Sequence, residues 1–196
     1  MNRKNKGFTL VEMIIVVSIF TILLGILVPS VTSVFAFRAQ RAANSMAAAL
    51  DRTKTEAANR LVGEMKLEKK SDGYYISYYL DRGLSNTERV TKDEPEKIAP
   101  ANTLITICTT NNPEGSEMQP GDYVILTYDR ENGGFRPVQS DVMTQEEINT
   151  YLQERRDIPF KDDDGNYCTQ IIVKGGYRTR TVELNKDTGS YAIKAG

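Results

Sequence analysis

The sequence predicts an α+β protein in which a long N-terminal helix packs on a globular domain built from an antiparallel β-sheet. Three observations lead to this prediction. No residue from Met13 to Phe37 carries a charge. An alanine-rich stretch follows, with apolar residues three or four positions apart, as on one face of a helix. Beyond Gly63, short alternating segments are separated by Gly, Asn, Asp and Pro, which is typical of strands and turns.

The chain therefore divides into four regions. Residues 1–7 form a basic leader, 8–37 an apolar helical segment, 38–62 an amphipathic continuation of the helix, and 63–196 a mostly β domain. The 196 residues carry 25 basic and 26 acidic side chains and no histidine. The lack of histidine excludes imidazole catalysis, His-activated nucleophiles and His-ligated metals. The balanced charge gives no argument for nucleic-acid binding. We expect no cofactor and no enzymatic activity.

The leader and the apolar segment predict a membrane anchor. Arg3, Lys4 and Lys6 precede the uncharged run without any acid. Such a cluster stays on the cytoplasmic side of a membrane, so the body should lie outside. The run exceeds the roughly 20 residues that cross a bilayer and would be helical in lipid. Pro29 lies inside it, and a proline there usually bends the axis or breaks the helix in two.

Glu12 is an acid at the start of this apolar segment. A charged acid at the bilayer centre costs about 2.5–3.5 kcal/mol on insertion scales and less near an interface. Two interpretations follow: the carboxylate reaches the headgroups, or it awaits a positively charged partner.

The segment Gly7-Phe8-Thr9-Leu10-Val11-Glu12 resembles the type III signal of type IV prepilins and pseudopilins. The resemblance implies that a prepilin peptidase/methyltransferase cuts between Gly7 and Phe8 and methylates Phe8. It also implies that Glu12 pairs with the N-terminal amine of a neighbouring subunit, and that Pro29 bends the helix. The implied partners are this enzyme, other pilin or pseudopilin subunits, and an assembly platform in the inner or cytoplasmic membrane.

The implied function is that of a structural subunit, of the minor kind, in a type IV pilus-like filament or a type II secretion pseudopilus. Before assembly it would be a single-pass cytoplasmic membrane protein with its N-terminus in the cytoplasm. After assembly it would lie in a cell-surface or periplasmic filament. The alternative is a signal-anchored or secreted binding domain or hydrolase, with cleavage after Ala36. The acid and the length of the apolar run argue against an ordinary signal peptide.

The amphipathic continuation predicts one helix from Phe8 to Val62, ended by Gly63. Its expected buried stripe is Val31, Phe35, Ala39, Ala42, Met46, Ala49, Thr53, Ala57 and Leu61. Strands are expected at 64–70, 74–80, 104–109, 123–128, near 135–138, and at 167–174, 177–184 and 190–194. Thr144 and Glu147 fit a capping box that begins a helix from Gln145 to Arg155.

Two loops, 81–102 and 110–122, separate these strands and could carry a ligand site at a filament tip. The C-terminal segment, Ile171–Leu184 with a Gly175-Gly176 turn, resembles the C-terminal hairpin of the H-type minor pseudopilins.

Two smaller features leave alternatives open. Cys108 and Cys168 lack the spacing of a zinc site, and outside the cytoplasm they could form one disulfide or remain buried free thiols. The acids at 162–164 suggest calcium. An EF-hand loop that began at the first of them would place Tyr167 and Val173 where Gly and Glu are required. A solvated turn or a noncanonical Ca²⁺ site remains, and no metal ligand is assigned.

Overall fold

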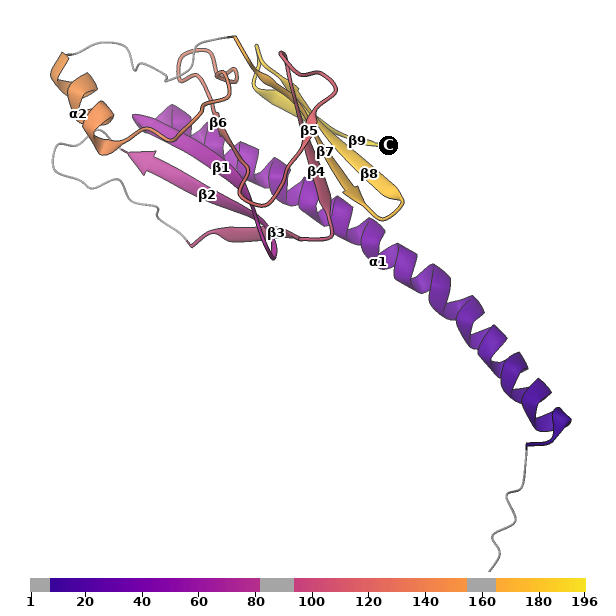
Figure 1. The fold of residues 1–196 in the computed structure, drawn as a ribbon. Helices are drawn as coiled ribbons and strands as arrows, with labels where there is room; N and C mark the ends of the chain where they lie inside the picture. The colour runs from indigo at the N-terminus through magenta and orange to yellow at the C-terminus, as the bar shows by residue number, and fades with distance from the viewer. Residues whose placement is uncertain (1–7, 82–93, 155–164) are drawn as a thin grey trace, which may run out of the picture.

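The computed structural model describes residues 8–81, 94–154 and 165–196. It contains a long helix and two antiparallel sheets (Figure 1). The N-terminal half of helix α1 (Leu10–Asn59) projects from the body, and its C-terminal half lies against both sheets. The predicted α+β class is confirmed. Within the described residues no helix qualifies as long and apolar enough to cross a membrane, so the predicted transmembrane segment is not confirmed.

Helix α1 is continuous through Pro29, so the alternative of two helices broken at this residue is wrong. A bend at Pro29 stays a prediction. The helix ends at Asn59, three residues before the predicted end, and Arg60 is already extended. Gly63 does not terminate the helix. It lies in the next strand, where an added Cβ would be 2.6 Å from the backbone nitrogen of Ala57. A side chain is excluded there because the strand passes so close to the end of the helix.

The strands form two antiparallel sheets rather than one. The first sheet has the order β3-β2-β1-β6, with β1 Val62–Lys70, β2 Gly73–Asp81, β3 Glu96–Pro100 and β6 Tyr123–Thr127. The second has the order β5-β4-β7-β8-β9, with β4 Leu104–Thr109, β5 Ser116–Glu117, β7 Cys168–Gly175, β8 Arg178–Asn185 and β9 Ser190–Ala195.

Several strand predictions need correction. Strand β3 lies inside the predicted loop 81–102, and β5 lies inside the predicted loop 110–122. Both are edge strands, which their sheet neighbours hold by backbone pairing despite a polar sequence. The strand predicted near 135–138 is reduced to isolated bridges of Phe135 with Tyr128 and of Gln139 with Ile125. The β7–β8 turn consists of Gly176 and Tyr177, because Gly175 pairs with Arg178.

The core lies between α1 and the two sheets. The predicted small-residue stripe is confirmed over the second half of the helix, where Ala39, Ala42, Met46, Ala49, Thr53 and Ala57 are all buried. Small side chains let the helix backbone approach the sheets closely. Met46 and Leu50 supply the bulk, and both are fully buried.

Helix α2 (Gln145–Glu154) confirms the predicted capping box. The Thr144 N–H donates to Glu147 Oε2 at 2.6 Å, and the Glu147 N–H donates to Thr144 Oγ1 at 3.3 Å. Arg155, the predicted last residue of this helix, and the acids at 162–164 lie outside the described residues.

Candidate assembly site at the start of the N-terminal helix

Helix α1 begins with a capping box that the sequence analysis missed. Thr9 is the N-cap residue, with an extended backbone, and Glu12 occupies the third helical position. The Thr9 N–H and Thr9 hydroxyl both donate to Glu12 Oε2 at 2.8 Å, and the Glu12 N–H donates to Thr9 Oγ1 at 3.2 Å. These bonds satisfy backbone donors that a helix start otherwise leaves without partners. The carboxylate is also favourable there because the helix dipole is positive at this end.

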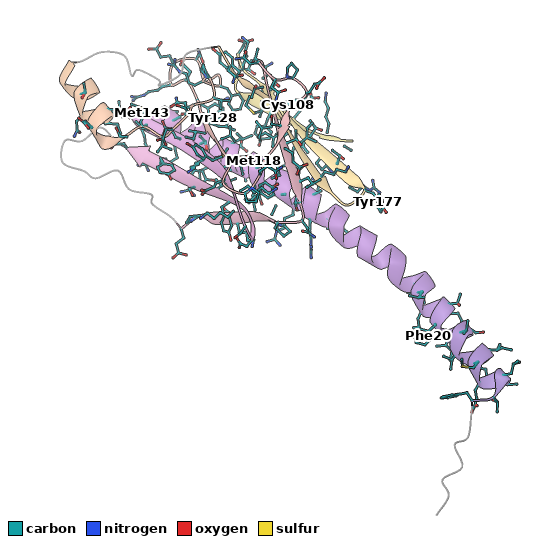
Figure 2. All side chains as sticks on the ribbon, in the orientation of Figure 1. Phe20, Cys108, Met118, Tyr128, Met143 and Tyr177 are labelled. Atoms are coloured by element: carbon teal, nitrogen blue, oxygen red, sulfur yellow. The ribbon has the colours of Figure 1, made fainter. Side chains whose placement is uncertain are left out.

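The surface above this cap is apolar and exposed. Phe8 is 83% exposed, and large apolar side chains project from the helix up to Ile26. Figure 2 shows this around Phe20, well away from the sheets. Fully burying each Val, Leu, Ile or Phe side chain contributes about 1.5–3 kcal/mol. An exposed apolar segment of this size therefore indicates an interaction surface for a membrane or for other chains.

Glu12 is the acidic residue of this exposed surface. Its Oε2 accepts both hydrogen bonds from Thr9, while no donor among the described residues reaches Oε1. The carboxylate is thus fixed in orientation by its own chain and retains one oxygen that can accept a further donor. Such an arrangement can bind a cation or an ammonium group brought by a second molecule.

The predicted site residues lie in three places. Phe8 and Glu12 both lie near the start of α1, whereas Gly7 lies outside the described residues. Pro29 is about 25 Å further along α1, at 1.5 Å per residue. The two cysteines lie in the second sheet. The capping partner Thr9 could have been found from sequence, because Thr9 and Glu12 have the same spacing as Thr144 and Glu147.

Cys108 and Cys168 are both buried and both free. They lie on the paired strands β4 and β7, where Cys108 is opposite Gln170 and Cys168 is opposite Thr109. Burial raises the pKa of the Cys168 thiol to about 12. Cys168 packs in the main core cluster. The Cys108 side chain instead lies next to Gly115, outside that cluster, where an added Cβ would be 2.7 Å from Cys108 Sγ. A disulfide between the two cysteines stays a prediction.

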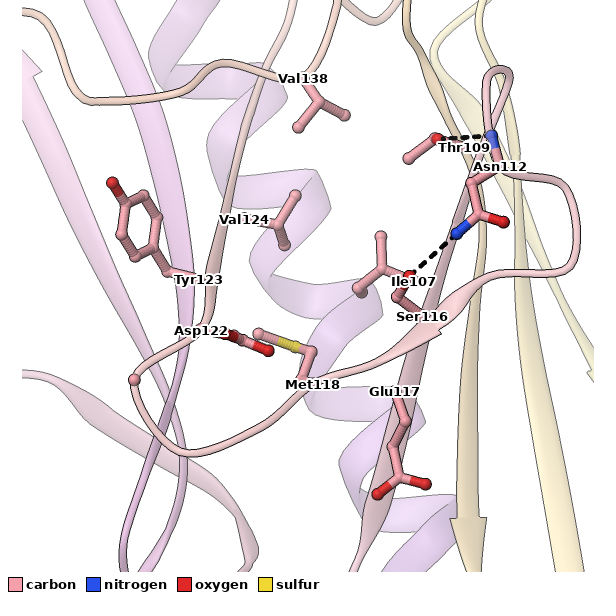
Figure 3. A pocket seen from close by; sticks show the side chains of 11 residues that line it. Ile107, Thr109, Asn112, Ser116, Glu117, Met118, Asp122, Tyr123, Val124 and Val138 are labelled. Atoms are coloured by element: carbon pink, nitrogen blue, oxygen red, sulfur yellow. Dashed lines mark hydrogen bonds between the residues drawn. The ribbon is translucent and has the colours of Figure 1, made fainter.

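A cavity of about 410 Å³ lies between β4 and β6, under the segment that contains β5 (Figure 3). Its walls are apolar at Ile107, Met118 and Val124, and Glu117 and Asp122 stand at its edge. The backbone N–H of Gln119 already binds Asp122 Oδ2 at 2.7 Å. In the part of the chain that the structure describes, no three His, Cys, Asp or Glu residues are grouped to hold a metal ion.

Comparison with known proteins bears on the N-terminal segment. Residues 2–28 match the family model described as the prokaryotic N-terminal methylation motif. The matched segment contains the capping box and the exposed apolar surface. The chain thus carries a prepilin-type methylation motif, which is consistent with the type IV prepilin and pseudopilin family and with a structural rather than an enzymatic class of protein. No curated protein and no solved structure matches the chain.

Proposed function

We propose that the protein is a structural subunit, of the minor kind, of a type IV pilus-like filament or a type II secretion pseudopilus. It is made as a membrane-anchored precursor, cut between Gly7 and Phe8, methylated at Phe8 and assembled through α1. The observation that carries this proposal is the exposed apolar segment of α1 up to Ile26, which begins with a capped acid and lies within the matched motif.

The anchor rests on the sequence. The uncharged run from Met13 to Phe37 continues beyond Ile26, the last residue of the projecting segment whose side chains are described. In the precursor this run lies in the bilayer, with Arg3, Lys4 and Lys6 on the cytoplasmic side. In the filament, the same surface packs against the helices of neighbouring subunits.

Glu12 sets the position of one subunit relative to the next. Cleavage creates an ammonium group at Phe8, and the free Oε1 of Glu12 in a neighbouring subunit accepts it. Breaking such a pair in an apolar core costs several kcal/mol, more than the net value of forming it. The pair therefore selects the correct register more than it adds stability.

Two variants separate this pairing from simple helix capping. Glu12→Ala removes both the carboxylate and its bonds to Thr9. Thr9→Val removes the hydroxyl and keeps the carboxylate. Both precursors should be cut normally, because the glycine at the junction is unchanged. We expect Glu12→Ala to be lost from sheared filaments and Thr9→Val to be incorporated. Equal incorporation of Glu12→Ala and the unaltered chain would refute the pairing.

The mass of the mature chain tests processing independently. A chain that starts at Phe8 with one added methyl group supports the filament subunit. A chain that starts at Phe37 would instead show release of a free domain by a signal peptidase.

A further inference from the structure

The β7–β8 hairpin ends in an exposed tyrosine. Gly176 and Tyr177 form its two-residue turn, with Gly176 at φ 60°. Tyr177 is 92% exposed, the most exposed of the large apolar and aromatic residues in the described part of the chain. Figure 2 shows it beside α1, at the side of the body from which the projecting half of the helix departs. An aromatic side chain held on a tight turn away from the core indicates a contact surface.

Side-chain contacts show where this turn lies along the axis of α1. The Arg180 guanidinium donates to Gln40 Oε1 near the start of β8. Further along, the Tyr191 hydroxyl donates to Asp51 Oδ2 at 2.7 Å, and Lys54 Nζ donates to the Thr188 carbonyl at 3.0 Å. Strand β8 therefore runs alongside α1 in the same direction, with its first residues nearest the projecting half.

The turn reaches the level of the uncharged run. Tyr177 precedes Arg180 by three residues, or about 10 Å of extended chain. This distance corresponds to about seven residues of helix. Counted back from Gln40, the turn lies level with residue 33 of α1, before Arg38, the first charged residue after the run. If the uncharged run of α1 lies in a bilayer, Tyr177 therefore lies at the level of the lipid headgroups where the helix leaves the bilayer.

The residues around the turn are basic. Lys174 and Arg178 flank it and are exposed, and Arg41 is exposed on the adjacent part of α1. None of these three forms an ion pair with another described residue. A tyrosine flanked by basic side chains combines the residue types that are enriched at membrane interfaces and that bind anionic lipid headgroups.

We propose that the β7–β8 turn docks on the anionic headgroup surface of the membrane that holds α1, with Tyr177 in the interface and Lys174 and Arg178 on lipid phosphates. This inference rests on the proposed membrane anchoring of α1. Docking gives the body a second attachment point, so that its tilt and rotation about the helix are fixed before assembly. Leaving the membrane then requires breaking the contact.

The full chain can report this contact because it contains no tryptophan. A Tyr177→Trp variant is placed in nanodiscs of phosphatidylcholine alone or mixed with phosphatidylglycerol. We expect a blue-shifted emission and quenching by brominated lipids with the anionic lipid, weakening as salt is raised. The control is Glu131→Trp. Glu131 is exposed in the turn after β6, near Lys54 in the last turns of α1 and therefore away from the projecting half of the helix. The control variant should be unaffected by lipid charge.

Removing the two basic side chains tests how strongly their charge contributes to docking. Each basic residue near an anionic surface changes binding about fivefold, so Lys174→Gln with Arg178→Gln should lower the docked-to-free ratio about 25-fold. The matched control, Arg130→Gln with Lys186→Gln, removes two charges elsewhere and should change nothing. Hydrogen exchange of the hairpin amides in the unaltered chain gives a readout without substitution, and slower exchange is expected with the anionic lipid.

Three results would overturn the proposal. The tryptophan of Tyr177→Trp could respond equally to neutral and anionic discs. The charge-removing pair could leave the signal unchanged. The signal could depend on the number of chains per disc, which would show contact with a second copy instead of lipid. Co-elution of the chain with the discs reports anchoring by α1 separately, so failure of docking is distinguishable from failure of the proposed function.

Discussion

Two buried tyrosines should respond in opposite directions to the same substitution. Tyr74 is fully buried, and its hydroxyl accepts the backbone N–H of Ile105 at 3.2 Å, which joins the two sheets. Tyr74→Phe leaves that N–H buried without a partner and should cost about 1–3 kcal/mol of unfolding free energy. Tyr128 is also buried, but its hydroxyl has no hydrogen-bond partner among the described residues. Tyr128→Phe removes an unsatisfied polar group and should be neutral or stabilising.

Both substitutions keep the ring, so packing changes little. The Tyr128 ring stays against Phe135, with centroids 4.4 Å apart. The assay is urea unfolding of the full chain in detergent, followed by near-ultraviolet circular dichroism of the tyrosines. With an m value of about 2 kcal/mol per M, a loss of 2 kcal/mol lowers the midpoint by about 1 M. Equal destabilisation by the two variants would refute the assignment of the Tyr74 hydroxyl as a bond between the sheets.

Three further predictions concern other parts of the fold. Thr9→Val should cost the start of α1 about 1 kcal/mol and speed hydrogen exchange of the Glu12 amide, and unchanged exchange would contradict the cap. Because burial raises the pKa of Cys168 to about 12, iodoacetamide should label it very slowly in the folded protein at pH 8 and readily after denaturation. Denatured, unreduced protein that shows no thiols would instead establish a Cys108–Cys168 bridge. Gly63→Ala should cost about 1–3 kcal/mol, measured by thermal unfolding, because its Cβ would overlap the helix backbone, and an unchanged midpoint would disprove that close approach.

The local features of the fold could be predicted from the sequence. The apolar run and the stripe of small residues from Ala39 to Ala57 each depend on neighbours in the chain. The division into two sheets could not be predicted, because it depends on distant pairing, such as Leu67 of β1 with Val124 of β6. Strand β3 was missed for the same reason. Its sequence of Glu, Lys, Ile, Ala and Pro has little strand propensity, and pairing with β2 imposes its conformation.

The candidate site was predicted in part. The motif identified Phe8 and Glu12, whereas Thr9, the capping partner three residues before Glu12, was not predicted. The hairpin turn shows a related limit. Gly175 and Gly176 predicted a turn, yet only the pairing of β7 with β8 decides which residues occupy it. The shift by one residue places Tyr177 at the tip, and this position gives it its exposure.

The two partners of Glu12 are compatible. Thr9 donates both of its hydrogen bonds to Oε2, so an incoming ammonium group can bind Oε1 without breaking the cap. A carboxylate with no partner in an apolar environment would cost much more than one already bound by two donors. On the proposed function, the cap thus lowers the cost of carrying Glu12 in the membrane, and it fixes the oxygen that the next subunit must find. The same carboxylate then contributes to the stability of the single chain and to the register of the filament. Glu12→Ala removes both contributions, whereas Thr9→Val weakens only the first, because the backbone N–H of residue 9 still donates to Oε2.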